Sequence, residues 1–136
     1  MKIDGSCQCG SITYEAEADE HAVGICHCTD CQKFSGSAFR VGVPVTEQSF
    51  KLLSGTLKVY VKTAASGGKR EQVFCPDCGT HLYSTSVKEG DTPRMFRVRV
   101  PTANQASQLI PSTQGWFRSA QKWVTGLDAI PSRPQQ

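Results

Sequence analysis

The segment Cys26-His27-Cys28-Thr29-Asp30-Cys31 places three cysteines within six residues, in the spacing C-x-C-x-x-C. A hydrophobic core gains nothing from three thiols this close together. A tight loop, by contrast, can direct three thiolate sulfurs at one zinc ion, about 2.3 Å from each. Three protein ligands leave one position of a tetrahedral ion open, which is typical of a reactive metal centre. We therefore predict that Cys26, Cys28 and Cys31 hold a catalytic zinc ion.

The other four cysteines form two close pairs that lie far apart in the sequence. Cys7 and Cys9 are near the N-terminus, and Cys75 and Cys78 precede Gly79, which can adopt the positive φ of a tight turn. Four cysteines are the ligand set of a closed, structural zinc site. All seven cysteines are then used, and we expect two zinc ions per chain.

Two other interpretations of the cysteines are weaker. The odd count of seven, the close spacings and the lack of an apolar leader region argue against a disulfide framework. A C-x-x-C redox centre would open a helix within a βαβ unit, and the sequence shows no such unit.

The composition excludes several classes of partner. No apolar run approaches the roughly 18 residues of a membrane helix, so we expect no membrane contact and a cytoplasmic location, where thiols stay reduced. The formal net charge of +3 falls to about zero once seven thiolates and two Zn²⁺ ions are counted, so basicity gives no reason to expect a nucleic-acid partner. The oligomeric state is left open.

Alternating apolar and polar residues predict a mostly β domain with few short helices. In residues 95–100, Phe96 and Val98 lie opposite Arg97 and Arg99, which we assign to a solvated face. Further strands are expected at 10–16, 23–26, 37–43 (ended by Pro44), 57–62, 70–74 and 82–87.

The ends of two other segments can be predicted from capping and from apolar side chains. Thr29 or Asp30 is expected to cap a short helix that Gly36 closes. Trp123, Leu127 and Ile130 are expected to anchor the C-terminal segment. We therefore predict a single zinc-binding domain over residues 1–131 and a frayed tail over 132–136.

Three blocks of sequence resemble the glutathione-dependent formaldehyde-activating enzyme family, which also includes centromere protein V. The blocks are residues 5–10 with Tyr14, residues 26–31 with Ser35-Gly36-Ser37, and residues 74–80. A weaker match continues at Trp123 and residues 127–131. The resemblance implies an Mss4-like fold, with small β-sheets organised around zinc. It also implies the same division of the cysteines, with Cys7, Cys9, Cys75 and Cys78 structural and Cys26, Cys28 and Cys31 catalytic.

The activity that the resemblance implies is that of a zinc-dependent carbon–sulfur lyase. Such an enzyme joins glutathione to formaldehyde, or to a related aldehyde, as an S-hydroxymethyl adduct. Its partners would be a glutathione-like thiol and an aldehyde. The alternative is a non-catalytic zinc module that binds a protein or chromatin partner, since fold alone does not decide function. A fourth protein ligand on the three-cysteine zinc would favour that alternative, and an open position beside a pocket would favour the enzyme.

A few other side chains are candidates for the site. His27 is expected to point away from the metal, toward solvent or the surroundings of the ligands, and His81 could approach either site. Asp30 is interpreted as a turn or cap residue. Basic side chains could bind the carboxylates of glutathione, and they are Lys33, Arg40, Arg70, Arg97 and Arg99.

Overall fold

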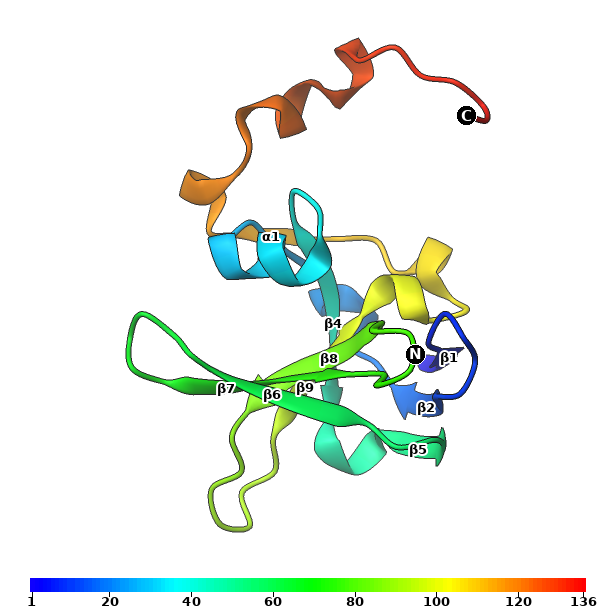
Figure 1. Cartoon of the computed structure of the whole chain (residues 1–136), viewed down its shortest axis with the longest axis vertical. Coiled ribbons are helices and arrows are strands. Elements are labelled where there is room, and N and C mark those ends of the chain that lie inside the picture. The colour runs from blue at the N-terminus through cyan, green and yellow to red at the C-terminus, as the bar shows by residue number, and fades with distance from the viewer.

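The computed structural model describes residues 1–136, which form two β-sheets around one core (Figure 1). The smaller sheet has the order β1-β2-β5, with β1 at Lys2–Ser6, β2 at Thr13–Glu17 and β5 at Lys51–Ser54. The larger sheet has the order β10-β3-β4-β9-β8-β7-β6 and is antiparallel except where β10 pairs with β3. Its strands are β3 (Gly24–Cys26), β4 (Arg40–Thr46), β6 (Lys58–Thr63), β7 (Lys69–Phe74), β8 (His81–Ser86), β9 (Met95–Arg99) and β10 (Thr113–Gly115).

Helices are short and lie between or beyond the strands. The one α-helix, α1, spans Thr29–Ser35. The 3-10 helices are Glu20–Ala22, Glu47–Ser49, Val100–Thr102, Ala106–Gln108, Phe117–Ser119 and Lys122–Ala129. The prediction of a mostly β domain with few short helices is therefore confirmed. The alternation pattern predicted fewer strands than the structure contains, because β1, β5 and β10 lack a clear alternation of apolar and polar residues.

One face of the larger sheet is apolar and contributes to the core. Val43, Val45 and Val98 are fully buried there or nearly so, together with Ile3 and Tyr14 of the smaller sheet. Burial of these side chains supplies the main stabilisation of the two-sheet arrangement.

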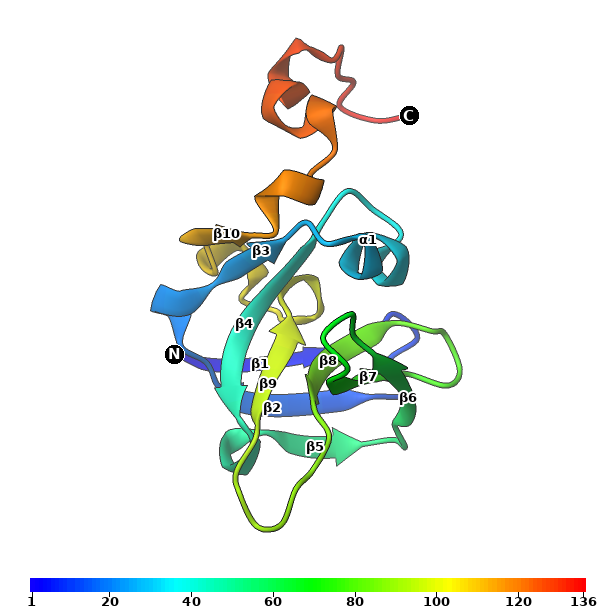
Figure 2. The same cartoon turned by 90° about the vertical axis from the view of Figure 1, so that its left-hand side faces the viewer.

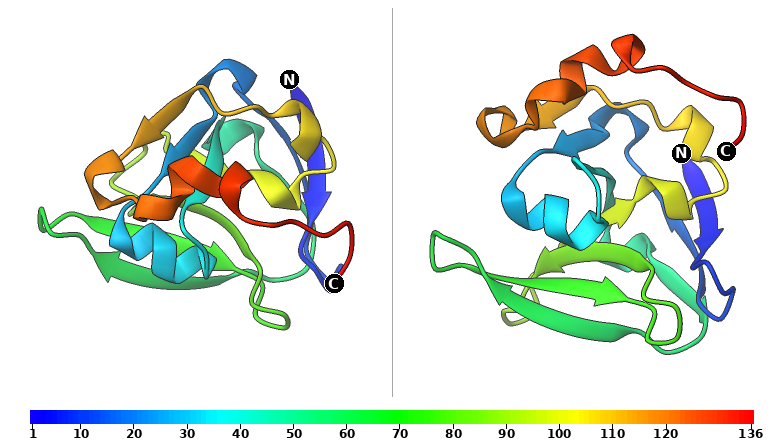
Figure 3. Two further views of the ribbon diagram at one scale, coloured as in Figure 1. Left: turned by 90° about the horizontal axis from the view of Figure 1, so that it is seen from above. Right: turned by 45° about the horizontal axis from the view of Figure 1, so that its top comes forward.

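The opposite face of the larger sheet is polar. Residues that pair directly on neighbouring strands point to the same face, and the register pairs Cys26 with Arg40, Gly42 with Arg99, and Gln72 with Ser84. The helix α1 lies over this face, above β6, β7 and β8 (Figures 1 and 3). The polar face is thus partly covered, and the space between it and α1 becomes available for a site.

Two predictions about where individual elements begin and end are corrected. The helix α1 is capped by Cys28, whose Sγ accepts from the backbone N–H of Cys31, and not by Thr29 or Asp30; Gly36 closes it at φ 62° as expected. Pro44 lies inside β4 and does not end it. Its carbonyl accepts from the backbone N–H of Asp19, 3.0 Å away, so the strand continues through a residue that lacks a donor of its own.

The C-terminal segment is not anchored in the way we predicted. Trp123, Leu127 and Ile130 are 50%, 50% and 51% exposed, and the 3-10 helix Lys122–Ala129 has no buried residue. Figure 2 shows this segment leaving the body of the molecule beyond β10. A short 3-10 helix presents few side chains to any one neighbour, so its apolar groups do not reach the core. No helix in the structure is long and apolar enough to cross a membrane.

Candidate metal centres and the adjoining cavity

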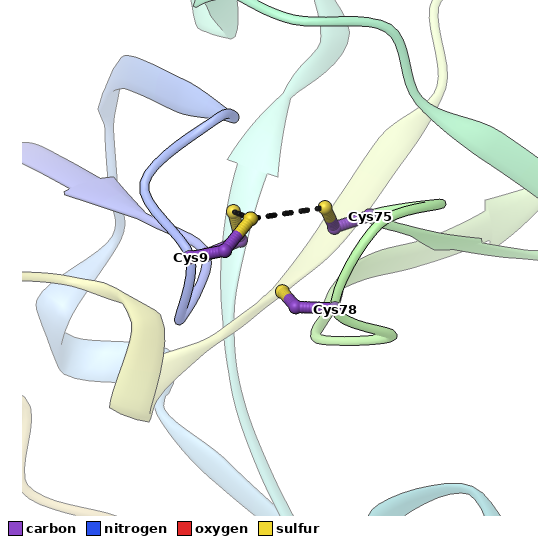
Figure 4. Close-up of side chains that lie close together, drawn as sticks. Cys9, Cys75 and Cys78 are labelled. Carbon is purple, nitrogen blue, oxygen red and sulfur yellow. Dashed lines mark hydrogen bonds between the residues drawn. The ribbon is translucent and has the colours of Figure 1, made fainter.

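The first candidate centre joins the turn after β1 to the turn between β7 and β8. The Sγ atoms of Cys7 and Cys9 are 3.6 Å apart, and those of Cys9 and Cys75 are 3.9 Å apart. Figure 4 shows the Cys9, Cys75 and Cys78 side chains converging from the two turns. Sulfurs placed tetrahedrally, about 2.3 Å from one ion, are separated by about 3.8 Å. The donor set and its spacing therefore fit a zinc ion.

Backbone and hydroxyl donors surround these four sulfurs. The backbone N–H of Ile12 donates to Cys7 Sγ at 3.3 Å, and the Thr80 hydroxyl lies 3.1 Å from Cys78 Sγ. Hydrogen bonds from Thr80 lower the pKa of Cys78 to about 5. Gly79 adopts φ 76°, and its N–H donates to the Cys75 carbonyl at 2.9 Å, which closes the predicted turn. These donors favour thiolates, the form in which cysteine binds metal.

The second candidate centre comes from one short stretch of chain. Cys26 ends β3, Cys28 caps α1 and Cys31 lies in the first turn of that helix. The three sulfurs lie within 4.8 Å of one another, and no further Cys, His, Asp or Glu completes the group. Three converging thiol donors fit a zinc ion that keeps one position free for another ligand.

An arginine from the polar sheet face contacts this second centre. Arg40 Nε donates to Cys31 Sγ at 3.4 Å. A hydrogen bond with Cys26, followed by the positive charge of Arg40, holds the pKa of Cys31 well below its ordinary value. The same hydrogen bond and burial raise the pKa of Cys26. Of these two cysteines, Cys31 is therefore the more readily ionised.

A cavity of about 410 Å³ opens directly onto the three cysteines. Its floor is the polar face of the larger sheet, its roof is the start of α1, and Trp116 and Ser119 of the C-terminal segment form one side. Its basic lining residues are Arg40, Lys62, Arg70 and Arg99, and its one acidic lining residue is Asp30. Cavities of this size hold small organic ligands.

Neither candidate histidine belongs to a cysteine cluster. His27 is completely buried, packs edge-on against Phe39 and Phe117, and bonds through Nε2 to Gln114 Oε1 at 2.8 Å. It therefore points away from the metal position, but not toward solvent. His81 stacks on Phe74 and lines a neighbouring cavity, where burial lowers its pKa.

Asp30 has a different role from the predicted turn or cap. Its carboxylate accepts from Lys62 Nζ at 2.8 Å. The Lys62 side chain is only 18% exposed, so the pair connects α1 to the edge strand β6 across the cavity. Lys62 was not among the residues singled out from the sequence, although its alternation with Val61 indicated the polar side of a strand.

The five candidate basic residues divide into two groups. Arg40, Arg70 and Arg99 line the cavity, whereas Lys33 is exposed and Arg97 lies outside it. The assignment of Arg99 to a solvated face is wrong, because the side chain is only 8% exposed. Gln72 and Ser84 also line the cavity and were missed. The sequence signal for such residues is the alternation of side chains along a strand, which places Gln72 on the same face as Arg70.

Two known proteins resemble this chain, one in sequence and one in fold. An uncharacterized lyase of Schizosaccharomyces pombe is 30% identical over 82 residues, which are 60% of this chain and 56% of the yeast protein. The matched region thus spans little more than half of that relative. A crystal structure of a Rhodobacter sphaeroides protein superposes with a TM-score of 0.61 at 17% identity, covering 82% of this chain and 98% of that one, and so shares the fold.

A family model provides the broadest match. The model described as glutathione-dependent formaldehyde-activating enzyme matches residues 2–119, which include all seven cysteines and the three segments that carry them. This match covers most of the chain, and the chain therefore belongs to the glutathione-dependent formaldehyde-activating enzyme family.

Proposed function

We propose that this protein is a zinc-dependent carbon–sulfur lyase that joins a glutathione-like thiol to formaldehyde or a related aldehyde. The observation that carries the proposal is the cavity of about 410 Å³ that opens onto a group of three cysteines with no fourth protein ligand. Membership of the family and the lyase name of the yeast relative support the same reaction class.

The proposed roles of the cysteines follow their two positions. Cys26, Cys28 and Cys31 hold the ion beside the cavity, and Cys7, Cys9, Cys75 and Cys78 hold the structural ion. When bound by Cys26, Cys28 and Cys31, zinc would lower the pKa of a substrate thiol at its free position and keep it as a thiolate.

The proposed reaction is the addition of the thiol to the aldehyde, assisted by charged side chains around the cavity. The thiol releases its proton to water on ionising, the thiolate sulfur adds to the carbonyl carbon, and the carbon–oxygen π pair moves to oxygen, which takes a proton back from water. Arg40 and Arg99 place positive charge beside the cysteines, where it stabilises the negative oxygen as it forms. The ion pair of Lys62 with Asp30 holds the cavity wall against α1. Reversal of the same steps breaks the carbon–sulfur bond.

The alternative of a non-catalytic binding module is less well supported. A purely structural metal is usually enclosed by four protein ligands, and the Cys26/Cys28/Cys31 group has three. We keep the alternative as one outcome of the experiment that follows.

The experiment measures exchange between free and adducted thiol in metal-loaded protein. Thiols add to formaldehyde without a catalyst, so the assay must resolve rates at equilibrium, for example by exchange NMR with glutathione and a panel of aldehydes. We expect exchange to accelerate in proportion to the protein concentration for at least one aldehyde. Exchange at the uncatalysed rate for the entire panel, in protein with two bound zinc ions, would contradict the lyase and favour the binding module.

A further inference from the structure

Arg99 is a buried cation without an acidic partner. Its side chain donates to the Arg97 carbonyl at 3.1 Å and to Gln72 Oε1 at 3.2 Å, and both acceptors are neutral. Burial lowers the pKa of Arg99 to about 10, so the group remains charged at neutral pH. A buried charge is costly unless an opposite charge compensates it. Its position on the cavity lining indicates that the compensating charge comes from within the cavity.

Two more arginines converge on the same place. Arg40 and Arg70 line the cavity with Arg99, and none of the three takes part in an ion pair with an acid. Arg94, in contrast, is neutralised by Glu47 and Glu71. The lone acidic group of the cavity, Asp30, is already paired with Lys62. The three guanidinium groups thus repel one another with no resident carboxylate between them.

The cysteines do not balance this charge. Three thiolates with one Zn²⁺ carry a net charge of −1, and a substrate thiolate would make it −2. Three guanidinium groups exceed either value. This excess of positive charge favours the binding of a further anion in the cavity, and a carboxylate matches the forked donors of arginine.

A glycine on the polar sheet face leaves space for one of these three arginines. Gly42 pairs with Arg99 on the neighbouring strand and carries no side chain on that face. A Cβ at Gly42 would lie 2.8 Å from Nη1 of Arg40, so the guanidinium of Arg40 occupies the space above the glycine. Arg40 is thereby held between the cysteines and Arg99.

We propose that Arg40, Arg70 and Arg99 form a carboxylate-binding subsite, and that the carbonyl substrate is a short aldehyde acid, of which glyoxylate is the simplest. The substrate half of this proposal rests on the proposed thiol–aldehyde chemistry. Arg40 touches a ligand sulfur, so an anion bound there lies close to the reacting atoms. In glyoxylate the carboxylate is bonded directly to the reacting aldehyde carbon, whereas both carboxylates of glutathione are several bonds from its sulfur.

The reaction with such a substrate is an addition that needs no oxidant. The thiolate sulfur bonds to the aldehyde carbon, the π pair moves to the aldehyde oxygen, and a proton from water, equal to the one that the thiol released, completes the hydroxyl group. The product is an S-substituted hydroxy acid whose carboxylate stays at the subsite.

Binding of an unreactive carboxylate tests the subsite directly. Glycolate has the size of glyoxylate but no aldehyde group, and ethylene glycol is its uncharged counterpart. In calorimetric titrations of zinc-loaded protein, we expect glycolate to bind and ethylene glycol not to bind. Arg99→Gln should weaken the binding of glycolate by about tenfold or more, because charge-assisted hydrogen bonds are lost. Arg97→Gln, on the same strand face but outside the cavity, is the matched control and should bind glycolate as the wild type does.

Folding of each variant is checked by circular dichroism and zinc content. Arg99→Gln removes an uncompensated buried charge, so it should melt no lower than the wild type. Gly42→Ala is a second variant. It should weaken the binding of glycolate, because the added methyl group displaces the guanidinium of Arg40. Equal glycolate binding by Arg99→Gln and wild type would show that Arg99 does not bind the carboxylate and would overturn the three-arginine subsite, as would no binding by the wild type.

A second measurement identifies which substrate carries the carboxylate. With 2-mercaptoethanol, a thiol that has no carboxylate, we expect faster adduct exchange for glyoxylate than for formaldehyde. A preference that appears only with glutathione would assign the carboxylate to the thiol and overturn the aldehyde-acid proposal. Catalysed formaldehyde exchange without glycolate binding would reject the subsite and leave the proposed function intact. Arginine-dependent glycolate binding without any catalysed exchange would retain the subsite and reject the proposed function.

Discussion

The Sγ of Cys9 lies 3.9 Å from the Sγ of Cys75, although 66 residues separate them in the chain. Between them the chain forms most of both sheets and the whole of the Cys26/Cys28/Cys31 group. A metal bound to these sulfurs would therefore close a long loop, whereas a metal on Cys26, Cys28 and Cys31 closes almost none. This difference separates the expected effects of the two centres on stability.

We expect Cys75→Ser to destabilise the whole domain. Cys75 is completely buried, and structural zinc contributes roughly 10–16 kcal/mol in small peptides, more than the total stability of many domains. The variant should be unfolded, or should melt far below the wild type, in thermal scans followed by circular dichroism. An unchanged melting temperature would rule out a structural role for this cluster.

Fully loaded protein should contain two zinc ions per chain. The structure has two separate groups of cysteine sulfurs, each within 4.8 Å, and no group shares a ligand with the other. Elemental analysis after zinc reconstitution in a reducing buffer measures the count. One tightly bound ion per chain would count against the three-cysteine site.

The grouping of the cysteines was accessible from the sequence because the group of three depends on local spacing and the two remaining close pairs add up to a complete set of four ligands. Residues 26–31 bring three sulfurs together within a single turn, and the two remaining pairs complete a set of four. The period of two in residues 95–100 likewise separated Phe96 and Val98 from Arg97 and Arg99 correctly.

What covers each face could not be predicted in the same way. Arg99 is buried because α1, more than sixty residues earlier in the chain, lies over its side of the sheet. Alternation identifies the face of a strand but contains no information about a distant element that packs there. Trp123 illustrates the converse, since an apolar side chain favours burial and yet this one stays 50% exposed.

Removal of residues 122–136 should leave the melting temperature essentially unchanged. This segment contains no buried residue, and the truncation keeps Gln121, whose Nε2 donates to Gln32 Oε1 at 2.8 Å. Thermal scans and zinc analysis of the truncated protein would check the expectation. A large drop in melting temperature would show that Trp123, Leu127 or Ile130 is anchored after all and would support a domain that extends to residue 131.

The Glu47 carboxylate should stabilise the fold in a pH-dependent way. It accepts from Arg94 at 2.9 Å and from Lys88 at 2.8 Å, and these bonds lower its pKa to about 2. The unfolded pKa is about 4.3, so the stabilisation is complete above that value and is lost as pH falls toward 2. The difference in melting temperature between wild type and Glu47→Gln should be constant from pH 7 to 5 and shrink below pH 4. Exposed Glu89→Gln is the control and should show no such difference; a Glu47→Gln effect that did not shrink in acid would contradict the assignment.

Cys28→Ser should leave the protein folded but without lyase activity. Cys28 lies in the middle of a ligand group supplied by six consecutive residues. Loss of this metal site therefore changes the conformational entropy of the unfolded chain only slightly. Its Sγ also caps α1 by accepting from the Cys31 N–H at 3.3 Å, and a serine hydroxyl can replace that acceptor. The free coordination position for a thiol, however, exists only while three thiolates hold the ion. We therefore expect a near-native circular dichroism spectrum, one zinc ion per chain and adduct exchange at the uncatalysed rate. Undiminished exchange in a variant that has lost its second zinc would reject catalysis at the three-cysteine site and favour the zinc-binding module.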